Sequence, residues 1–151
     1  MSEPNSADFA LVRIQTAAGP PAVTALLCGI EGVEITRSVQ TNETYRRDCA
    51  KPNRPGTRKL RSTGQSWTIT GSGSDNIDLE EEYSDAFGVR KIYSIELYRD
   101  DGTDGGALMG RYGGSALMTT RNQSYSQDSG GGTTSVTLEG EGDLVWTPAG
   151  A

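Results

Sequence analysis

An alternation of apolar and polar residues, repeated in short stretches along the chain, most constrains the fold. Between residues 65 and 70, Trp67 and Ile69 fall on one face while Ser and Thr side chains share the other. Successive side chains of a strand point to opposite faces of a sheet, so this period of two predicts half-buried β-strands. The pattern predicts strands at residues 9–16, 23–27, 33–39, 65–70, 91–99, 107–112, 116–122, 133–139 and 143–147.

Glycine-rich turns separate several of these stretches. The sequence DGTDGG at residues 101–106 is a strong turn signal that joins two predicted strands as a hairpin. Similar signals at residues 71–73 and 130–132, and around Gly140 and Gly142, predict further turns.

Composition indicates one domain with a thin core. The chain has 151 residues, of which 34% are hydrophobic and 20 are glycine. That length fits a single domain, which we expect to span residues 1–151 behind a flexible N-terminus at residues 1–8. We expect a mainly β architecture, a sandwich or barrel of about eight or nine strands with one short α-helix and a long extended loop.

One segment departs from the strand pattern. Leu79, Tyr83, Ala86 and Phe87 recur at helical spacing, which predicts a helix over residues 78–87. Leu79, Tyr83 and Phe87 are then expected to face the sheet. Suitable end signals flank it: Asp75 or Asn76 as cap, Asp78, Glu80 and Glu81 in the first turn, and Gly88 at the end.

Charge is segregated along the chain. Half of the 14 Lys and Arg residues lie between residues 46 and 61, where Asp48 is the only acid, so this segment carries +6 and the remainder −12 of the net −6. Its prolines exclude a continuous central strand or helix, which predicts an exposed basic arm or long hairpin tip within residues 43–64. The arm cations are Arg46, Arg47, Lys51, Arg54, Arg58, Lys59 and Arg61.

Three interpretations of the arm compete. A run of charge is often only a solvated loop. Clustered cations also suit nucleic-acid phosphates, but no aromatic residue follows Tyr45 in the arm for base stacking, and the acidic remainder would repel a polyanion. The third interpretation, which we favour, is docking on the acidic body of another copy, a contact that generates rings or filaments.

No constellation for catalysis or metal binding emerges from the sequence. Histidine is absent, which removes the commonest general base and metal ligand. Cys28 and Cys49 lack metal-site spacing and are expected to be free thiols. Consecutive glutamates at residues 80–82 point in different directions on a helix, and DGTDGG lacks the remaining calcium-ligand spacing. We expect no catalytic, cofactor-binding or metal residue, no cofactor, and no enzymatic activity.

The order of features resembles the major tail tube protein family of long-tailed bacteriophages and related gene transfer agents. A strand GVEITRSVQTNETYRR is followed by a polar loop, a Trp-centred strand GQSWTITGSG and an acidic helix IDLEEEYSDAFG. The end, with GSALMTTRNQSYSQ before TTSVTLEGEGDLVW, is also similar, so the resemblance covers residues 32–146. The basic, proline-containing loop carries more charge than the family pattern.

The resemblance implies a structural virion protein, assembled in the host bacterial cytoplasm and located in the tail. Six copies would form a ring, and stacked rings would enclose a channel for DNA delivery, whose acidic wall would repel phosphates. Partners would be other copies, tape measure and tail terminator proteins, and DNA in transient non-specific passage, with no membrane insertion. A related secretion tube remains open, and the main rival is a monomeric β-sandwich binding module for virion decoration or carbohydrate.

Overall fold

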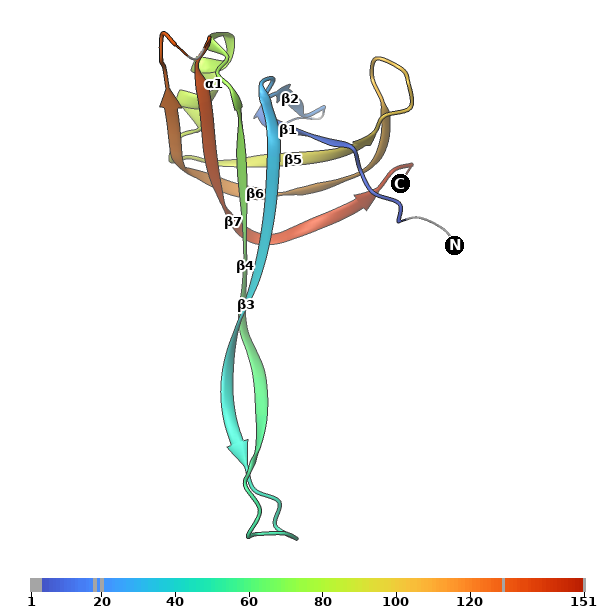
Figure 1. The fold of residues 1–151 in the computed structure, drawn as a ribbon, viewed down its shortest axis with the longest axis vertical. Helices are drawn as coiled ribbons and strands as arrows, with labels where there is room; N and C mark the ends of the chain where they lie inside the picture. The colour runs from blue at the N-terminus through green and yellow to red at the C-terminus, as the bar shows by residue number, and fades with distance from the viewer. Residues whose placement is uncertain (1–3, 18, 20, 129, 151) are drawn as a thin grey trace.

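The computed structural model describes residues 4–17, 19, 21–128 and 130–150, which form seven strands and one short helical segment. Figure 1 shows a curved body from which one long hairpin projects. In chain order the elements are β1 (Phe9–Ala17), β2 (Val23–Leu26), β3 (Ile30–Arg46), β4 (Thr57–Ser74), the 3₁₀ turn η1 (Ile77–Leu79), α1 (Glu80–Ala86), β5 (Arg90–Arg99), β6 (Ala107–Ser124) and β7 (Thr133–Pro148).

The strands form one antiparallel sheet in the order β2-β1-β5-β6-β7-β4-β3. Its two edge strands, β2 and β3, are consecutive in the chain, and the turn between them folds one edge over the other. The Leu27 amide donates to the Val12 carbonyl at 2.9 Å, and the Ser74 amide donates to the Gly29 carbonyl at 2.9 Å. The sheet therefore closes on itself as a β-sandwich-like body, and the mainly β fold predicted from the sequence is confirmed.

The core lies between the two layers of this folded sheet. The predicted alternation is confirmed on β4, where Trp67 and Ile69 are buried, and on β5, where Tyr93 and Ile95 are fully buried. The other buried hydrophobic residues are Val12, Ile14, Leu27, Ile30, Tyr83, Ala86, Ala116, Met118, Val136 and Leu138. This is a small core for a chain of 151 residues, as the composition indicated.

The helical segment lies where the sequence predicted it, but its bounds differ from residues 78–87: a 3₁₀ turn, Ile77–Leu79, leads into an α-helix that spans only Glu80–Ala86. The Asn76 side chain accepts a hydrogen bond from the Asp78 amide at 3.1 Å, and Gly88, with φ of +74°, follows its C-terminal end. Tyr83 is buried, but Phe87 is 51% exposed, so the prediction that Phe87 faces the sheet is wrong. The reason is local: Phe87 has extended backbone angles at the C-cap, which turn its side chain away from the helix's apolar face.

The predicted number of strands is also wrong, because two pairs of expected strands are continuous. Residues 107–112 and 116–122 belong to β6, and residues 133–139 and 143–147 belong to β7. Near Gly142, which has φ of +72°, the pairing of β6 with β7 shifts register instead of ending. Glycine allows such a bulge to bend a strand without a turn. The glycines at residues 71–73 likewise continue β4.

The basic arm is a β-hairpin for most of its length. The expected extended loop at residues 43–64 is paired strand from Glu43 to Arg46 and from Thr57 onward, and only residues 47–56 form the tip. Both prolines of the arm, Pro52 and Pro55, lie in that tip, where they interrupt no ladder hydrogen bond. Residues 4–7 have no regular structure, residues 1–3 lie outside the described residues, and the flexibility of the N-terminus stays a prediction.

Candidate assembly surfaces

The arm begins where β4 and β7 separate. β7 pairs with β4 only over Thr68–Ser74, so from Thr57 to Trp67 β4 is paired with β3 alone. Beyond this point β7 follows β6 away from the arm (Figure 1). A two-stranded hairpin with both faces in solvent gains little stability from burial. The arm therefore has no hydrophobic core of its own.

Trp67 fills a glycine-lined socket at the separation. Its indole Nε1 donates to the Gly142 carbonyl oxygen at 3.1 Å, and the side chain is 5% exposed. A Cβ on Gly140 would lie 2.1 Å from the indole ring, and one on Gly114 would lie 2.7 Å from it. The glycines of β6 and β7 thus leave the space that Trp67 occupies. Trp67 packs in the core as expected, whereas Trp146 is 44% exposed and leans on Tyr112.

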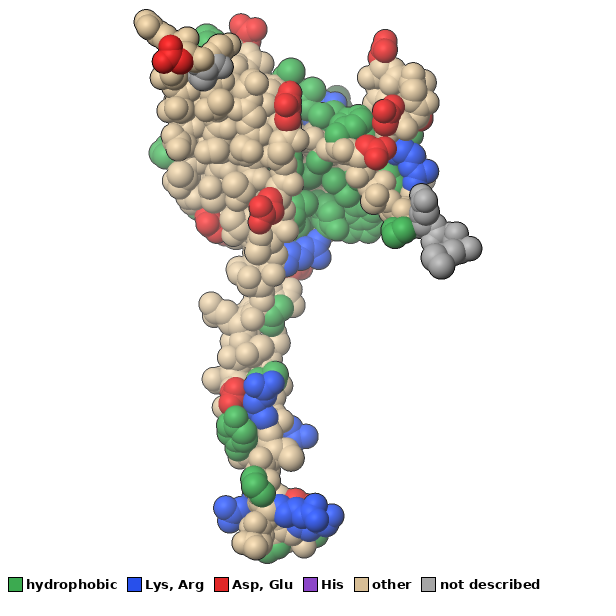
Figure 2. Space-filling model, in the orientation of Figure 1, with side chains coloured by type: hydrophobic (Ala, Val, Ile, Leu, Met, Phe, Trp, Pro, Cys, Tyr) green, Lys and Arg blue, Asp and Glu red, His purple; other side chains and the backbone are tan. Residues whose placement is uncertain are grey.

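All seven predicted arm cations are exposed, and the structure keeps them together on the hairpin (Figure 2). Arg47, Lys51 and Arg54 lie in the tip, and the other four lie on its two strands. Within the described part of the chain, Arg58 is the one arm cation with a carboxylate in ion-pair range, 3.6 Å from Glu43. The remaining arm charge is not neutralised by the subunit that carries it.

Strand register sorts the arm into two faces. Residues directly opposite in an antiparallel pair share a face. Glu43 lies opposite Leu60 and Tyr45 opposite Arg58, and these residues form the neutral face. The ion pair of Glu43 with Arg58 joins them, and a hydrogen bond to Glu43 raises the pKa of the Tyr45 hydroxyl.

The other face is cationic. Its opposed pairs are Asn42 with Arg61, Thr44 with Lys59 and Arg46 with Thr57. It carries three cations and no acid. A hollow of about 430 Å³ on the arm is lined by Asn42, Thr44, Arg46, Lys59, Leu60 and Arg61.

At the other end of the body, a buried charge cluster fixes α1 to the sheet. The Arg121 guanidinium lies 4.1 Å from the centre of the Tyr83 ring and donates to the Glu80 carboxylate at 2.9 Å. Asp75 lies 3.6 Å from the same guanidinium and accepts a hydrogen bond from the Tyr125 hydroxyl. Burial raises the pKa of Tyr83. Arg121 could not be recognised from the sequence, because its partners are more than 35 residues away along the chain.

The α1 end is the acidic counterpart of the arm. Residues 75–85 contain six acids and no Lys or Arg. Asp78, Glu81 and Asp85 are exposed and recur at spacings of three and four, so they share the solvent face of the helical segment formed by η1 and α1. Ile77 beside them is 71% exposed. Figure 1 places this end and the arm at opposite ends of the long axis.

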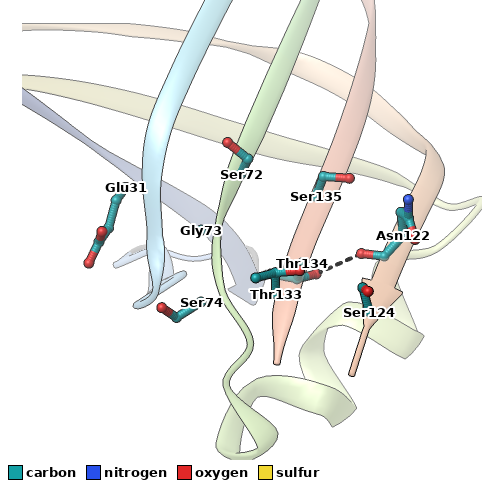
Figure 3. A pocket seen from close by; sticks show the side chains of 9 residues that line it. All are labelled: Glu31, Ser72, Gly73, Ser74, Asn122, Ser124, Thr133, Thr134 and Ser135. Carbon is teal, nitrogen blue, oxygen red and sulfur yellow. Dashed lines mark hydrogen bonds between the residues drawn. The ribbon is translucent and has the colours of Figure 1, made fainter. Parts of the chain in front are cut away.

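One hollow on the body is lined mainly by hydroxyl and amide side chains of β4, β6 and β7. This hollow, shown in Figure 3, has a volume of about 400 Å³, and Glu31 is its one ionisable group. There the Thr134 hydroxyl donates to the Asn122 carbonyl at 3.2 Å. Among the described residues, no three His, Cys, Asp or Glu side chains gather as metal ligands. Cys28 and Cys49 are exposed free thiols.

No helix within the described residues is long and apolar enough to span a bilayer. No protein-family model and no curated protein matches the chain. Solved structures of tube proteins do match it, over nearly the whole chain.

The chain is similar to a protein in the tail of an empty gene transfer agent particle, at 17% identity and a TM-score of 0.64, over 91% of this chain and 94% of that one. It is similar to the SPP1 tail tube protein at 12% identity and a TM-score of 0.63, over 96% and 80%. A chain of the sheath-tube complex of an extracellular contractile injection system, PVC, matches at 16% identity and a TM-score of 0.60, over 93% and 88%.

These matches define a class, the β-sandwich-like fold found in tail tubes and injection tubes. The chain has this tail tube fold, and the fold implied by the sequence resemblance is confirmed. At these identities the likeness concerns the fold, so assembly and partners follow as proposals.

Proposed function

We propose that this chain is a structural tail tube protein. Copies assemble into hexameric rings, and the rings stack into a tube whose channel delivers DNA to the host. The observation that carries the proposal is the match to tube proteins over more than nine tenths of this chain, among them one from a tail solved with sixfold symmetry. In this role the whole chain, residues 1–151, is one building block located in the virion tail after assembly in the bacterial cytoplasm.

Open strand edges support self-assembly. Residues 57–67 of β4 and 141–148 of β7 each have a strand on one side only. Unpaired edges are templates for strands of another chain, and closed rings of subunits remove them. The small core agrees with this, because neighbours in a ring would bury surface that the isolated subunit leaves open.

The arm provides contacts between subunits in this proposal. The arm carries unneutralised cations, whereas the rest of the chain carries a charge of −12. The arm is therefore attracted to the body of a second copy, while the acidic body would repel a polyanion. The same acidic body suits a channel through which DNA slides without sticking. The contact residues are Arg46, Arg47, Lys51, Arg54, Arg58, Lys59 and Arg61.

Other tail proteins complete the assembly. A tail terminator would cap the tube, a tape measure protein would fill it during assembly, and no membrane insertion or cofactor is involved. Among the similar solved structures are a sheath-tube complex, a sheath/tube terminator and a tube terminating cap of injection systems. We propose no catalytic role for any residue.

Assembly is tested by light scattering after size-exclusion chromatography, and by electron microscopy of concentrated protein. We expect rings with sixfold symmetry that stack into tubes as concentration rises. A protein that stays monomeric at millimolar concentration is instead a β-sandwich binding module, and the proposal is then wrong.

A further inference from the structure

We propose that the cationic face of the arm docks on the solvent face of the η1–α1 segment in the next copy along the tube. The inference rests on the proposed function, and it assigns the two surfaces that join one ring to the next. The cationic face consists of Arg46, Lys59 and Arg61, and the acceptor face consists of Asp78, Glu81 and Asp85 with Ile77.

The two surfaces are held at opposite ends of one continuous strand. β4 begins in the arm at Thr57, ends at Ser74 next to the acidic segment, and spans about 60 Å over its 18 residues. A subunit displaced along this strand therefore brings its α1 end toward the arm of its neighbour. The contact is head to tail, which leaves the same two surfaces free at the ends of every stack.

The two surfaces carry opposite charges, and in the part of the chain that the structure describes these charges are not used in ion pairs within their own subunit. Within the described residues, the three cations of the docking face have no carboxylate within ion-pair range. On the acceptor side, Arg121 engages Asp75 and Glu80, so these two acids hold the helix in place. Asp78, Glu81 and Asp85 remain exposed on the other side of the helix.

Both surfaces also carry apolar area beside their charges. Ile77 is 71% exposed at the acidic end. On the arm, the hollow of about 430 Å³ is lined by Asn42, Thr44 and the three cations of the docking face, whose side chains have aliphatic stems. Protein interfaces usually bury an apolar centre inside a polar rim. Ile77 is the side chain that we assign to this hollow.

Charge reversal on each side tests the assignment. In the triple variant R46E/K59E/R61E, or in D78K/E81K/D85K, we expect the concentration needed for tube formation to rise at least tenfold at low salt. Combining all six changes in one chain should restore stacking, because attraction returns with the signs exchanged. Thermal unfolding of each variant checks that the body remains folded.

A charge-matched control locates the contact on the arm. The triple variant R47E/K51E/R54E changes the net charge equally but alters only the tip, and we expect a smaller effect than for the docking face. Equal effects of the two triple variants would overturn the assignment of the face. Normal tubes from R46E/K59E/R61E at low salt would overturn the docking itself.

Chemical cross-linking tests the same contact in the unmodified protein, so the result does not depend on the folding of a variant. A carbodiimide joins amines to carboxylates in contact, so assembled tubes should yield intermolecular cross-links from Lys59 to Asp78, Glu81 or Asp85, identified by mass spectrometry. Lys59 cross-links to other acids alone overturn the inference while the proposed function stands. If the unmodified protein forms no tubes, both fall together.

Discussion

The indole Nε1 of Trp67 donates a hydrogen bond to the carbonyl oxygen of Gly142 at the point where β4 leaves β7. This contact ties the root of the arm to the bulge that turns β7 away from it. Because the socket has no Cβ at Gly140 or Gly114, the geometry depends on glycine at both positions.

Replacing Gly140 with Ala should therefore destabilise the subunit. Its Cβ would lie 2.1 Å from the Trp67 ring, so the ring or the strand must move. Overpacking of this kind costs about 1–3 kcal/mol. Gly64→Ala is the control, since no atom lies within 4 Å of its Cβ, and a comparison of the two urea-unfolding midpoints checks the prediction. Equal midpoints would show that the socket is not tight.

Tyr83→Asp should destabilise strongly, whereas Phe87→Asp should change little. Tyr83 is 2% exposed and lies under Arg121, while Phe87 is 51% exposed. Burying a carboxyl group in place of a packed ring costs on the order of 3–5 kcal/mol. Thermal unfolding followed by circular dichroism measures both variants, and similar losses for the two would contradict the orientation of α1.

Arg121→Ala should cost about 3–5 kcal/mol, because it leaves Asp75 with an uncompensated buried charge. Arg90→Ala removes an ion pair with Glu141 that is exposed on both sides, and about 0–1 kcal/mol is expected there. Chemical denaturation of both variants under the same conditions gives the comparison. A small effect at Arg121 would mean that Asp75 is solvated.

Alkaline pH should weaken the fold through Tyr93. Burial raises its pKa from 10.0 to about 12, so the folded state favours the neutral phenol. The associated stability is complete below pH 10, the unfolded value, and is lost as the pH rises toward 12. The loss is on the order of 2–3 kcal/mol.

Tyr93→Phe provides the control for this titration. The Tyr93 hydroxyl is buried and has no hydrogen-bond partner in the described part of the chain, so its removal should be neutral or slightly stabilising at pH 7. Above pH 10 the unfolding midpoint of the variant should fall less than that of the unmodified protein. Tyr83, whose pKa is also raised, would account for the remaining fall. An identical pH profile for both proteins would refute the role of Tyr93.

The arm should fluctuate in the free subunit and become ordered in the tube. Its two strands have no third partner, and hairpins of this kind are only marginally stable. Hydrogen exchange should show weak protection of residues 40–64 in the monomer and strong protection after assembly, while Ile69 is protected in both.

Salt should reduce assembly, because it screens the attraction between the arm cations and the acidic surface beyond a distance of about 8–10 Å.

Local signals in the sequence were sufficient for part of this structure. Period-two patterns located the buried faces around Trp67 and Tyr93, because side-chain alternation follows from strand geometry alone. The helix start at Asn76 and the left-handed Gly88 were also predictable, since each depends on its immediate neighbours. The cluster of cations between residues 46 and 61 can be recognised directly from the sequence.

Other features were misread because one residue type supports two structures. Glycine suits both a turn and a bulge, so Gly140 and Gly142 predicted a break where β7 continues. The arm strands bury neither face, so they lack the apolar alternation that reveals a strand. The Thr, Tyr and Leu residues on either side of the prolines were the available signal for a hairpin.

The sequence by itself determined the strand-rich character, the helix and the separation of +6 from −12. Only the tertiary structure decided that Arg46, Lys59 and Arg61 share one face of the arm, that Arg58 is neutralised by Glu43, and that the acidic helix lies at the far end of β4. These relationships depend on strand register and on pairing between distant segments. Register states which residues of two strands lie opposite each other. A short stretch of sequence contains only one of the two strands, so it does not reveal their register.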